Sequence, residues 1–146
     1  MTRQQVVFDT NVFIRRGWDR PAAEGLLSAV VLQELVAGAL DDAELRRLQA
    51  MRARYEREER LVVPNGEDWY EAGRILSLLR RGRRSHRTGR VPAIAREEQQ
   101  RLLRDVLIAR SARRIGALVV TEDLDDFRKI RRYCDVRAVH PRRYFS

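Results

Sequence analysis

Two short apolar runs that each lead into acidic residues are the clearest pattern along the chain. Residues 6–8 end at Asp9, and residues 117–120 are followed within three positions by Asp123. A continuous apolar run of this length, bounded by polar residues, predicts a strand buried on both faces, as in a parallel sheet. Ligands of open α/β sheets bind at the carboxyl ends of the strands, so we expect both acids to lie at such an edge.

Apolar residues at helical spacing mark the longer segments. The predicted helices cover residues 28–40 (with Ser28 as N-cap), 43–60, 67–79 and 96–115. Residues 17–21 are typical of a loop, and residues 136–139 of a short edge strand followed by a basic tail. A last helix is expected up to about residue 132. Asp123 therefore has a second interpretation, because Thr121 or Asp123 can cap this helix.

Two acids fall on helix faces that are otherwise apolar. Glu34 shares its side with Val30 and Val31, and Asp105 lies among leucine, isoleucine and alanine residues. Burying an unpaired carboxylate costs several kcal/mol or makes the group take up a proton. A metal ion would remove that cost.

The bulk composition indicates one soluble domain. The chain has 146 residues and is 44% hydrophobic, enough for a core of its own, so we expect a single domain over residues 1–146. No signal peptide and no apolar run of membrane length is evident, so we expect no membrane association. The single Cys134 fits a reducing cytoplasm.

The positive charge is carried almost entirely by arginine. The net charge is +9, and Lys129 is the one lysine. A genome that favours arginine codons would explain the choice of arginine, but not remove its consequence: nucleic acid is the expected polyanionic partner. Residues 80–90 form the most basic stretch, either a solvated connector or an arm that contacts phosphates. The candidates for RNA contact are Arg83, Arg84 and Arg87 in this stretch and Arg104 and Arg110 beside Asp105.

The four acids can converge at one edge of the sheet. Carboxylates that lie so close together repel one another unless a hard divalent cation lies among them. Oxygen ligands select Mg²⁺ or Mn²⁺ over zinc, and no His/Cys pair has zinc-ligand spacing. Mg²⁺ held by carboxylates serves phosphate chemistry, because it activates water and stabilises charge on phosphoryl oxygens.

The chain resembles PIN-domain ribonucleases, most closely the VapC-type toxins of bacterial toxin–antitoxin pairs. The resemblance rests on residues 8–12, on Ser28 with residues 30–38, on Asp105 with Ile108 and Ala109, and on residues 120–127. It implies a three-layer α/β/α sandwich around a parallel sheet and RNA cleavage that depends on Mg²⁺ or Mn²⁺.

The resemblance also assigns roles to residues and partners. It implies that the catalytic, metal-binding acids are Asp9, Glu34, Asp105 and Asp123, with Asp126 as a helper or second-metal ligand and with Thr10 and Asn11 in support. It further implies a homodimer silenced by an antitoxin protein. The chain departs from the family in a short segment between Asp9 and Ser28 and in the long basic stretch at residues 80–90.

Two other functions are weighed against this one. A phosphatase of the haloacid-dehalogenase type would use Asp9 as nucleophile, but it needs a second Asp where this chain has Asn11, and no suitable Lys is evident. A non-catalytic, basic nucleic-acid-binding protein would account for the charge. It would have no reason to place Glu34 and Asp105 on apolar faces.

Overall fold

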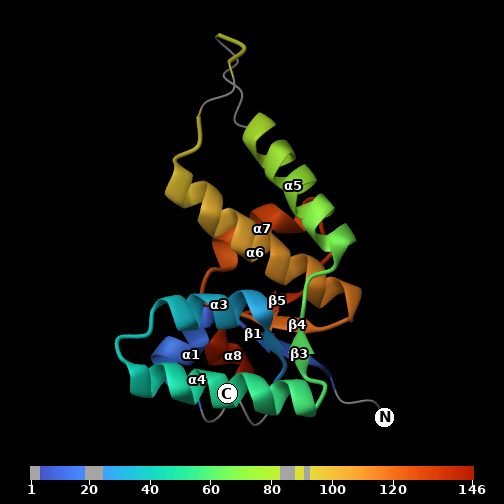
Figure 1. Cartoon of the computed structure of the whole chain (residues 1–146). Coiled ribbons are helices and arrows are strands. Elements are labelled where there is room, and N and C mark those ends of the chain that lie inside the picture. Colours follow the sequence, from blue (N-terminus) through green and yellow to red (C-terminus); the bar gives the residue numbers. More distant parts are fainter. Residues whose placement is uncertain (1–3, 19–24, 83–87, 91–92) are drawn as a thin grey trace.

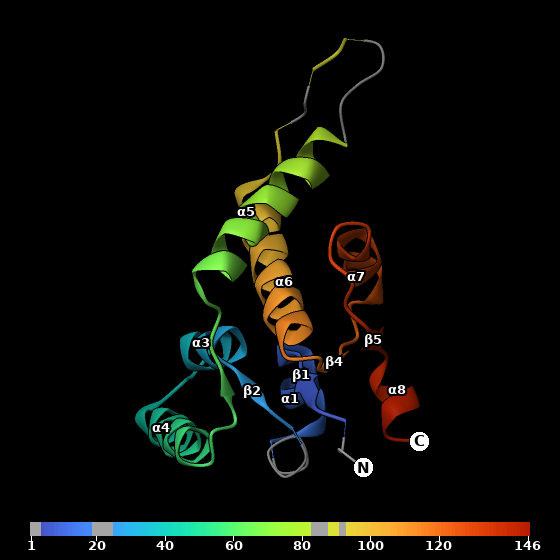
Figure 2. The same ribbon diagram turned by 90° about the vertical axis from the view of Figure 1, so that its right-hand side faces the viewer.

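Parallel strands run through the centre of the structure, a computed structural model that describes residues 4–18, 25–82, 88–90 and 93–146. The strands are β1 (Val6–Phe8), β2 (Leu27–Ser28), β3 (Leu61–Val62), β4 (Leu118–Val120) and β5 (Ala138–Val139). One sheet has the order β1-β4-β5, and β2 pairs with β3. A parallel bridge between Val7 and Leu26 brings the two sheets together. The strands therefore follow one another as β3-β2-β1-β4-β5 (Figure 2).

Helices connect the strands and cover them. They are α1 (Thr10–Arg16), α3 (Ala29–Ala37), α4 (Asp42–Arg57), α5 (Gly66–Arg81), α6 (Arg96–Arg114), α7 (Leu124–Arg131) and α8 (Pro141–Tyr144). Helices α3 and α4 lie beside β2 and β3, whereas α7 and α8 lie beside β5 (Figure 2). The predicted three-layer α/β/α sandwich with a central parallel sheet is confirmed. In the described part of the chain, no helix has both the length and the apolar character needed to cross a bilayer.

The predicted helix starts agree with the caps. The Ser28 side chain accepts a hydrogen bond from the Val30 N–H, and Asp41 accepts one from the Glu44 N–H. Asn65 and Asp68 form a capping box at the start of α5. In these segments local side-chain chemistry was sufficient to locate the helix.

Four elements were not expected, one of them the two-residue strand β3. Helix α1 follows Asp9 directly, β2 occupies two residues before α3, and α8 lies in the tail predicted only to be basic. The β-branched residues of α1 favour helix weakly, so burial of Val12 and Phe13 must stabilise it instead. Two-residue strands and a four-residue helix are too short to leave a periodic pattern.

The C-terminal tail supports the strand that ends at Asp9. The Phe8 ring packs edge-on against Tyr144, with 5.4 Å between ring centroids, and is stacked with Phe145 at 5.9 Å. Phe8 itself has no exposed surface. Packing of this kind fixes the end of β1, from which Asp9 extends.

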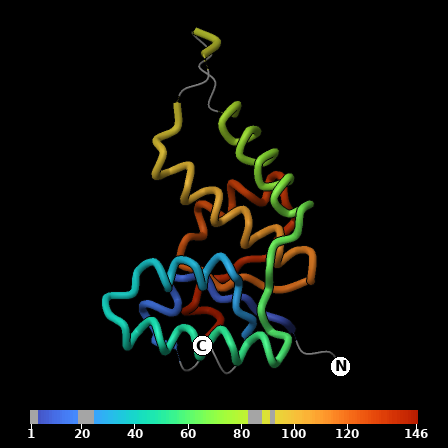
Figure 3. The backbone as a smooth tube through the Cα atoms, viewed as in Figure 1, coloured from blue at the N-terminus to red at the C-terminus, as the bar shows by residue number. Residues whose placement is uncertain are grey.

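Helices α5 and α6 form a long pair that rises away from the strands (Figures 1 and 2). The tube in Figure 3 shows α6 descending from the outer end of this pair and leading into β4. Helix α6 packs against α3, α7 and β4 as well as α5. Its inner half therefore lies where the candidate acids of several elements can meet.

Candidate metal centre

Asp9 is buried at the carboxyl end of β1. Its side chain is 4% exposed and accepts hydrogen bonds from the Thr10 N–H at 2.8 Å and the Thr121 hydroxyl at 2.7 Å. The pKa of Asp9 is raised to about 6, with burial as the main cause, while these two hydrogen bonds lower it. The predicted position at the sheet edge is what the structure shows.

Asp105 is the most perturbed acid of the site. It lies at the middle of α6 with 5% of its surface exposed, and its Oδ2 is buried without a hydrogen-bond partner. Its pKa is raised to about 8, first by burial and then by the charges of Asp9, Asp126, Asp123 and Glu34. A buried oxygen without a partner, surrounded by like charges, is typical of a site built for a cation.

Asp123 and Asp126 reach the same point from the start of α7. Carboxylate oxygens of Asp105, Asp123 and Asp126 all lie within 4.8 Å of one another. Asp123 stands at the N-cap position of α7, but its side chain makes no capping hydrogen bond. Capping therefore does not account for this acid, and its carboxylate is available to an ion.

Thr121 connects the two strand ends. Its hydroxyl donates to Asp9 Oδ2 and accepts from the Asp123 N–H at 3.0 Å. The pairing of Phe8 with Val120 places Thr121 directly beside Asp9. The side chain of Asn11 adds weak contacts of 3.5 Å from Nδ2 to Asp9 and Thr121, and its Oδ1 accepts a hydrogen bond from the Glu122 N–H.

Glu34 lies at the margin of this group. It raises the pKa of both Asp9 and Asp105, which places its charge near them. Its carboxylate pairs with Arg104, at 3.2 Å between Oε1 and Nε. We call Asp9, Glu34, Asp105, Asp123 and Asp126 together the acidic cluster.

The cluster fits a hard divalent cation. Any two oxygen ligands of one Mg²⁺ ion lie at most about 4.2 Å apart, because each bond is about 2.1 Å long. The oxygens of Asp105, Asp123 and Asp126 lie within 4.8 Å of one another, so they would have to move closer together to share an ion. These three residues could hold the ion, with Asp9 and Glu34 next to them, and an all-oxygen set favours Mg²⁺ or Mn²⁺.

The supporting residues and arginines are placed as follows. The hydroxyl of Thr10 is buried without a partner, so the hydroxyl that contacts Asp9 is that of Thr121. Arg104 lies at the cluster, but Arg110 is 12% exposed and directed toward Asp68 and Glu67. Arg83, Arg84 and Arg87 lie outside the described residues.

Sequence reasoning missed two members of the site. Thr121 was considered only as a helix cap, although a hydroxyl between a strand and an acid is a usable signal. Arg101 was not considered, although it lies four residues before Asp105 on α6 and therefore on the same face. Its Nε donates to Asp126 Oδ2 at 3.2 Å.

We expect the metal-free protein to lose stability as the pH rises from about 4 to about 8. Asp9 and Asp105 have pKa values of about 6 and about 8 when folded, above the ordinary value of 3.8. An acid whose pKa is raised on folding makes its full contribution to the stability of the fold below the pKa that it has in the unfolded chain. This contribution is lost as the pH rises through the folded pKa, at about 1.4 kcal/mol per pH unit for each group.

Thermal melting in EDTA between pH 5 and 8 tests this. Saturating Mg²⁺ should remove most of the fall, because the ion replaces the protons, and the gain in melting temperature should be larger at pH 8 than at pH 6. A melting temperature in EDTA that rises over this range would contradict the expectation.

Comparison with known proteins places the chain in a family. The structure is similar to that of VapBC-1 from nontypeable Haemophilus influenzae, with 21% identity, a TM-score of 0.58 and coverage of 94% of this chain and 98% of that one. It is also similar to DNA-bound VapBC from Salmonella typhimurium, with 23% identity, a TM-score of 0.54 and coverage of 94% and 98%. A third similar structure is VapBC-5 from Mycobacterium tuberculosis, described as a member of the VapBC family of toxin–antitoxin systems, with 23% identity, a TM-score of 0.50 and coverage of 94% and 99%.

These similarities concern the fold, since all three identities are below 25%. A comparison with curated protein sequences gave no match. The family profile described as PIN domain matches residues 6–133, which include β1, β4 and every member of the acidic cluster. The chain therefore belongs to the PIN domain family.

Proposed function

We propose that this chain is an endoribonuclease that depends on Mg²⁺ or Mn²⁺ and acts as the toxin of a toxin–antitoxin pair. The observation that carries the proposal is the buried carboxylate of Asp105, whose Oδ2 has no partner and which has an oxygen within 4.8 Å of oxygens of Asp123 and Asp126. Membership of the PIN domain family supports nuclease chemistry at this site.

The residues of the chain have distinct tasks in this proposal. Asp105, Asp123 and Asp126 would hold the ion, with Asp9 and Glu34 completing its surroundings. Thr121 and the Thr10 N–H fix the Asp9 carboxylate. When bound, Mg²⁺ supplies charge stabilisation at the phosphoryl oxygens and lowers the pKa of water. Arg104, which is 38% exposed, is available to a substrate phosphate.

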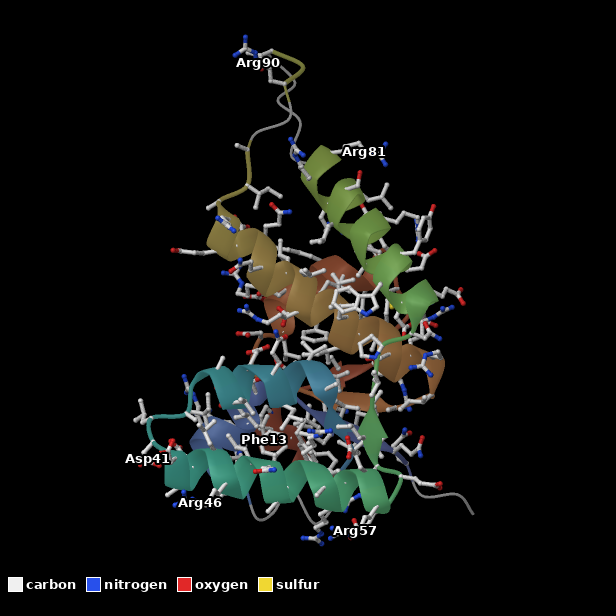
Figure 4. All side chains as sticks on the ribbon, in the orientation of Figure 1. Phe13, Asp41, Arg46, Arg57, Arg81 and Arg90 are labelled. Carbon is white, nitrogen blue, oxygen red and sulfur yellow. The ribbon has the colours of Figure 1, made fainter. Side chains whose placement is uncertain are left out.

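The net charge supports RNA as the substrate. The chain carries +9 overall, so the negative cluster lies in a molecule that attracts polyanions. Arg81 and Arg90 lie at the outer end of the α5–α6 pair, far from the strands (Figure 4). Arginines there would contact an RNA that extends beyond the site.

Cleavage of a labelled single-stranded RNA tests the proposal. The purified chain should cleave it with Mg²⁺ or Mn²⁺, stop in EDTA and resume when the ion is returned in excess. Asp9→Asn, purified in the same way, controls for contaminating ribonuclease and should be inactive. RNA binding without cleavage under all these conditions would favour the non-catalytic alternative.

The proposed partners are an antitoxin and a second copy of the chain, in the cytoplasm. Several of the similar structures are VapBC complexes, and one is described as belonging to a toxin–antitoxin system. Exposed apolar side chains near the α3–α4 turn, including Leu40 at 91%, are available for contact. Co-purification with the product of the adjacent gene, followed by size determination with and without it, tests both partners.

A further inference from the structure

Two carboxylates of the acidic cluster, those of Glu34 and Asp126, are already paired with cations of the chain itself. Arg104 Nε lies 3.2 Å from Glu34 Oε1. Asp126 Oδ2 lies 3.2 Å from Arg101 Nε, and Asp126 Oδ1 lies 3.9 Å from Lys129 Nζ. Within the described ranges, Asp9, Asp105 and Asp123 have no ion pair. The cluster thus has two acids paired with cations and three acids without such a partner in that part of the chain.

The two arginines are positioned to change partners. Arg101 and Asp105 are four residues apart on α6 and share one face, and Arg104 adjoins it. The side chains of Arg101 and Arg104 are 48% and 38% exposed, whereas Asp105 is buried. An exposed guanidinium can turn toward a bound phosphate without disturbing the buried carboxylate.

The charge balance of the acidic cluster indicates how phosphate binding and metal binding would affect each other. The cluster has five carboxylates and three cations, which leaves two formal negative charges. One divalent cation would balance them. A guanidinium binds phosphate through two parallel hydrogen bonds and competes well for it. When an arginine turns to phosphate, its carboxylate loses a cation and becomes a better metal ligand.

We propose that Arg101 and Arg104 form a phosphate-binding pair that, without substrate, occupies Asp126 and Glu34 and so opposes metal binding. The inference rests on the proposed function and adds a regulation to it. RNA and the divalent ion then bind cooperatively, since linkage makes each raise the affinity of the other by the same factor. Without RNA the site holds metal weakly.

A double-mutant cycle on metal affinity tests this without any activity measurement. Mn²⁺ binding to the metal-free protein is measured by calorimetry for the wild type, Arg104→Gln, Glu34→Gln and the double variant. Arg104→Gln should tighten binding about fivefold or more, the low end of measured couplings between sites. Glu34→Gln should change the Mn²⁺ affinity little when Arg104 is present. In the Arg104→Gln background it should weaken Mn²⁺ binding by a similar factor of about five.

Arg96→Gln is the matched control. Arg96 is an exposed residue of the same helix, with no ion pair among the described residues, and its loss changes the net charge equally. It should change Mn²⁺ affinity by less than about twofold, because exposed charges further away are screened. Additive effects in the cycle would mean that Arg104 acts only through its long-range charge, and would overturn the inference.

Sulfate serves as the probe for phosphate. Sodium sulfate, compared with sodium chloride at equal ionic strength, should tighten Mn²⁺ binding to the wild type but not to the Arg101→Gln/Arg104→Gln variant. Equal Mn²⁺ affinity in all variants, together with metal-dependent RNA cleavage, would overturn this inference and leave the nuclease proposal intact. Absence of both Mn²⁺ binding and cleavage would overturn both.

Discussion

Replacing Asp105 by asparagine should abolish RNA cleavage and at the same time stabilise the metal-free protein. Loss of a residue that merely orients a metal ligand lowers metal affinity or activity about 10- to 100-fold. Loss of a residue that binds the metal itself should therefore lower the rate of cleavage at least about 100-fold. The carboxylate that is removed has a pKa raised to about 8, so its ionisation opposes folding at alkaline pH. We expect a gain of roughly 1–3 kcal/mol at pH 8 in EDTA, since the unpartnered amide retains some desolvation cost.

Asp125→Asn is the control for this prediction. Asp125 lies on the first turn of α7 next to the cluster, but its side chain is 90% exposed and, among the residues that the structure describes, pairs with Arg128 alone. It should leave both cleavage and stability nearly unchanged. Chemical denaturation at pH 5 and pH 8 checks the stability effect, which should be larger at pH 8. A destabilised Asp105→Asn at pH 8 would show that the carboxylate is satisfied in a way that the geometry does not reveal.

The acids of the site were accessible from the sequence because each broke a local pattern. Asp9 and Asp123 end apolar runs, and Glu34 and Asp105 interrupt apolar helix faces. What the pattern did not contain was strand register. The position of Thr121 beside Asp9 follows from the pairing of Phe8 with Val120, which residues more than 100 positions apart cannot reveal by themselves.

The limits of sequence reasoning about the fold have the same origin. The long helices were predicted because caps and periodicity are local, as at the N-cap Ser28. Helix α1 depends on burial of Phe13, a tertiary effect that overrides weak helix propensity. The pairing of Arg110 with Asp68 was equally inaccessible, and it explains why Arg110 is directed toward the start of α5.

Asp68→Ala should be among the most destabilising single substitutions in the chain, at about 3–5 kcal/mol. Asp68 is fully buried at the start of α5 and accepts hydrogen bonds from the Asn65 N–H at 3.0 Å and from Arg114 Nε at 3.0 Å. Arg110, 12% exposed, lies 3.7 Å from its other oxygen. Alanine would remove the side-chain half of the capping box, the hydrogen bond from the Asn65 N–H, and leave the largely buried guanidinium of Arg110 without the Asp68 carboxylate. Urea denaturation measures the loss, and Glu67→Ala, which removes an exposed partner of Arg110, should cost less than about 1 kcal/mol.

The effect of the unpaired buried charge on stability can be separated from the effect of the lost capping-box hydrogen bond, because only the first depends on Arg110. Arg110→Met in the Asp68→Ala background removes the buried charge and keeps much of the side-chain volume. It should recover part of the lost stability, since a buried pair replaced on both sides costs far less than one broken on a single side. Asp68→Asn, whose amide oxygen can still accept from the Asn65 N–H, should fall between the wild type and Asp68→Ala. If the double variant were less stable than Asp68→Ala alone, Arg110 would be held by packing along α6, and the charge of Asp68 would not be what stabilises the base of the α5–α6 pair.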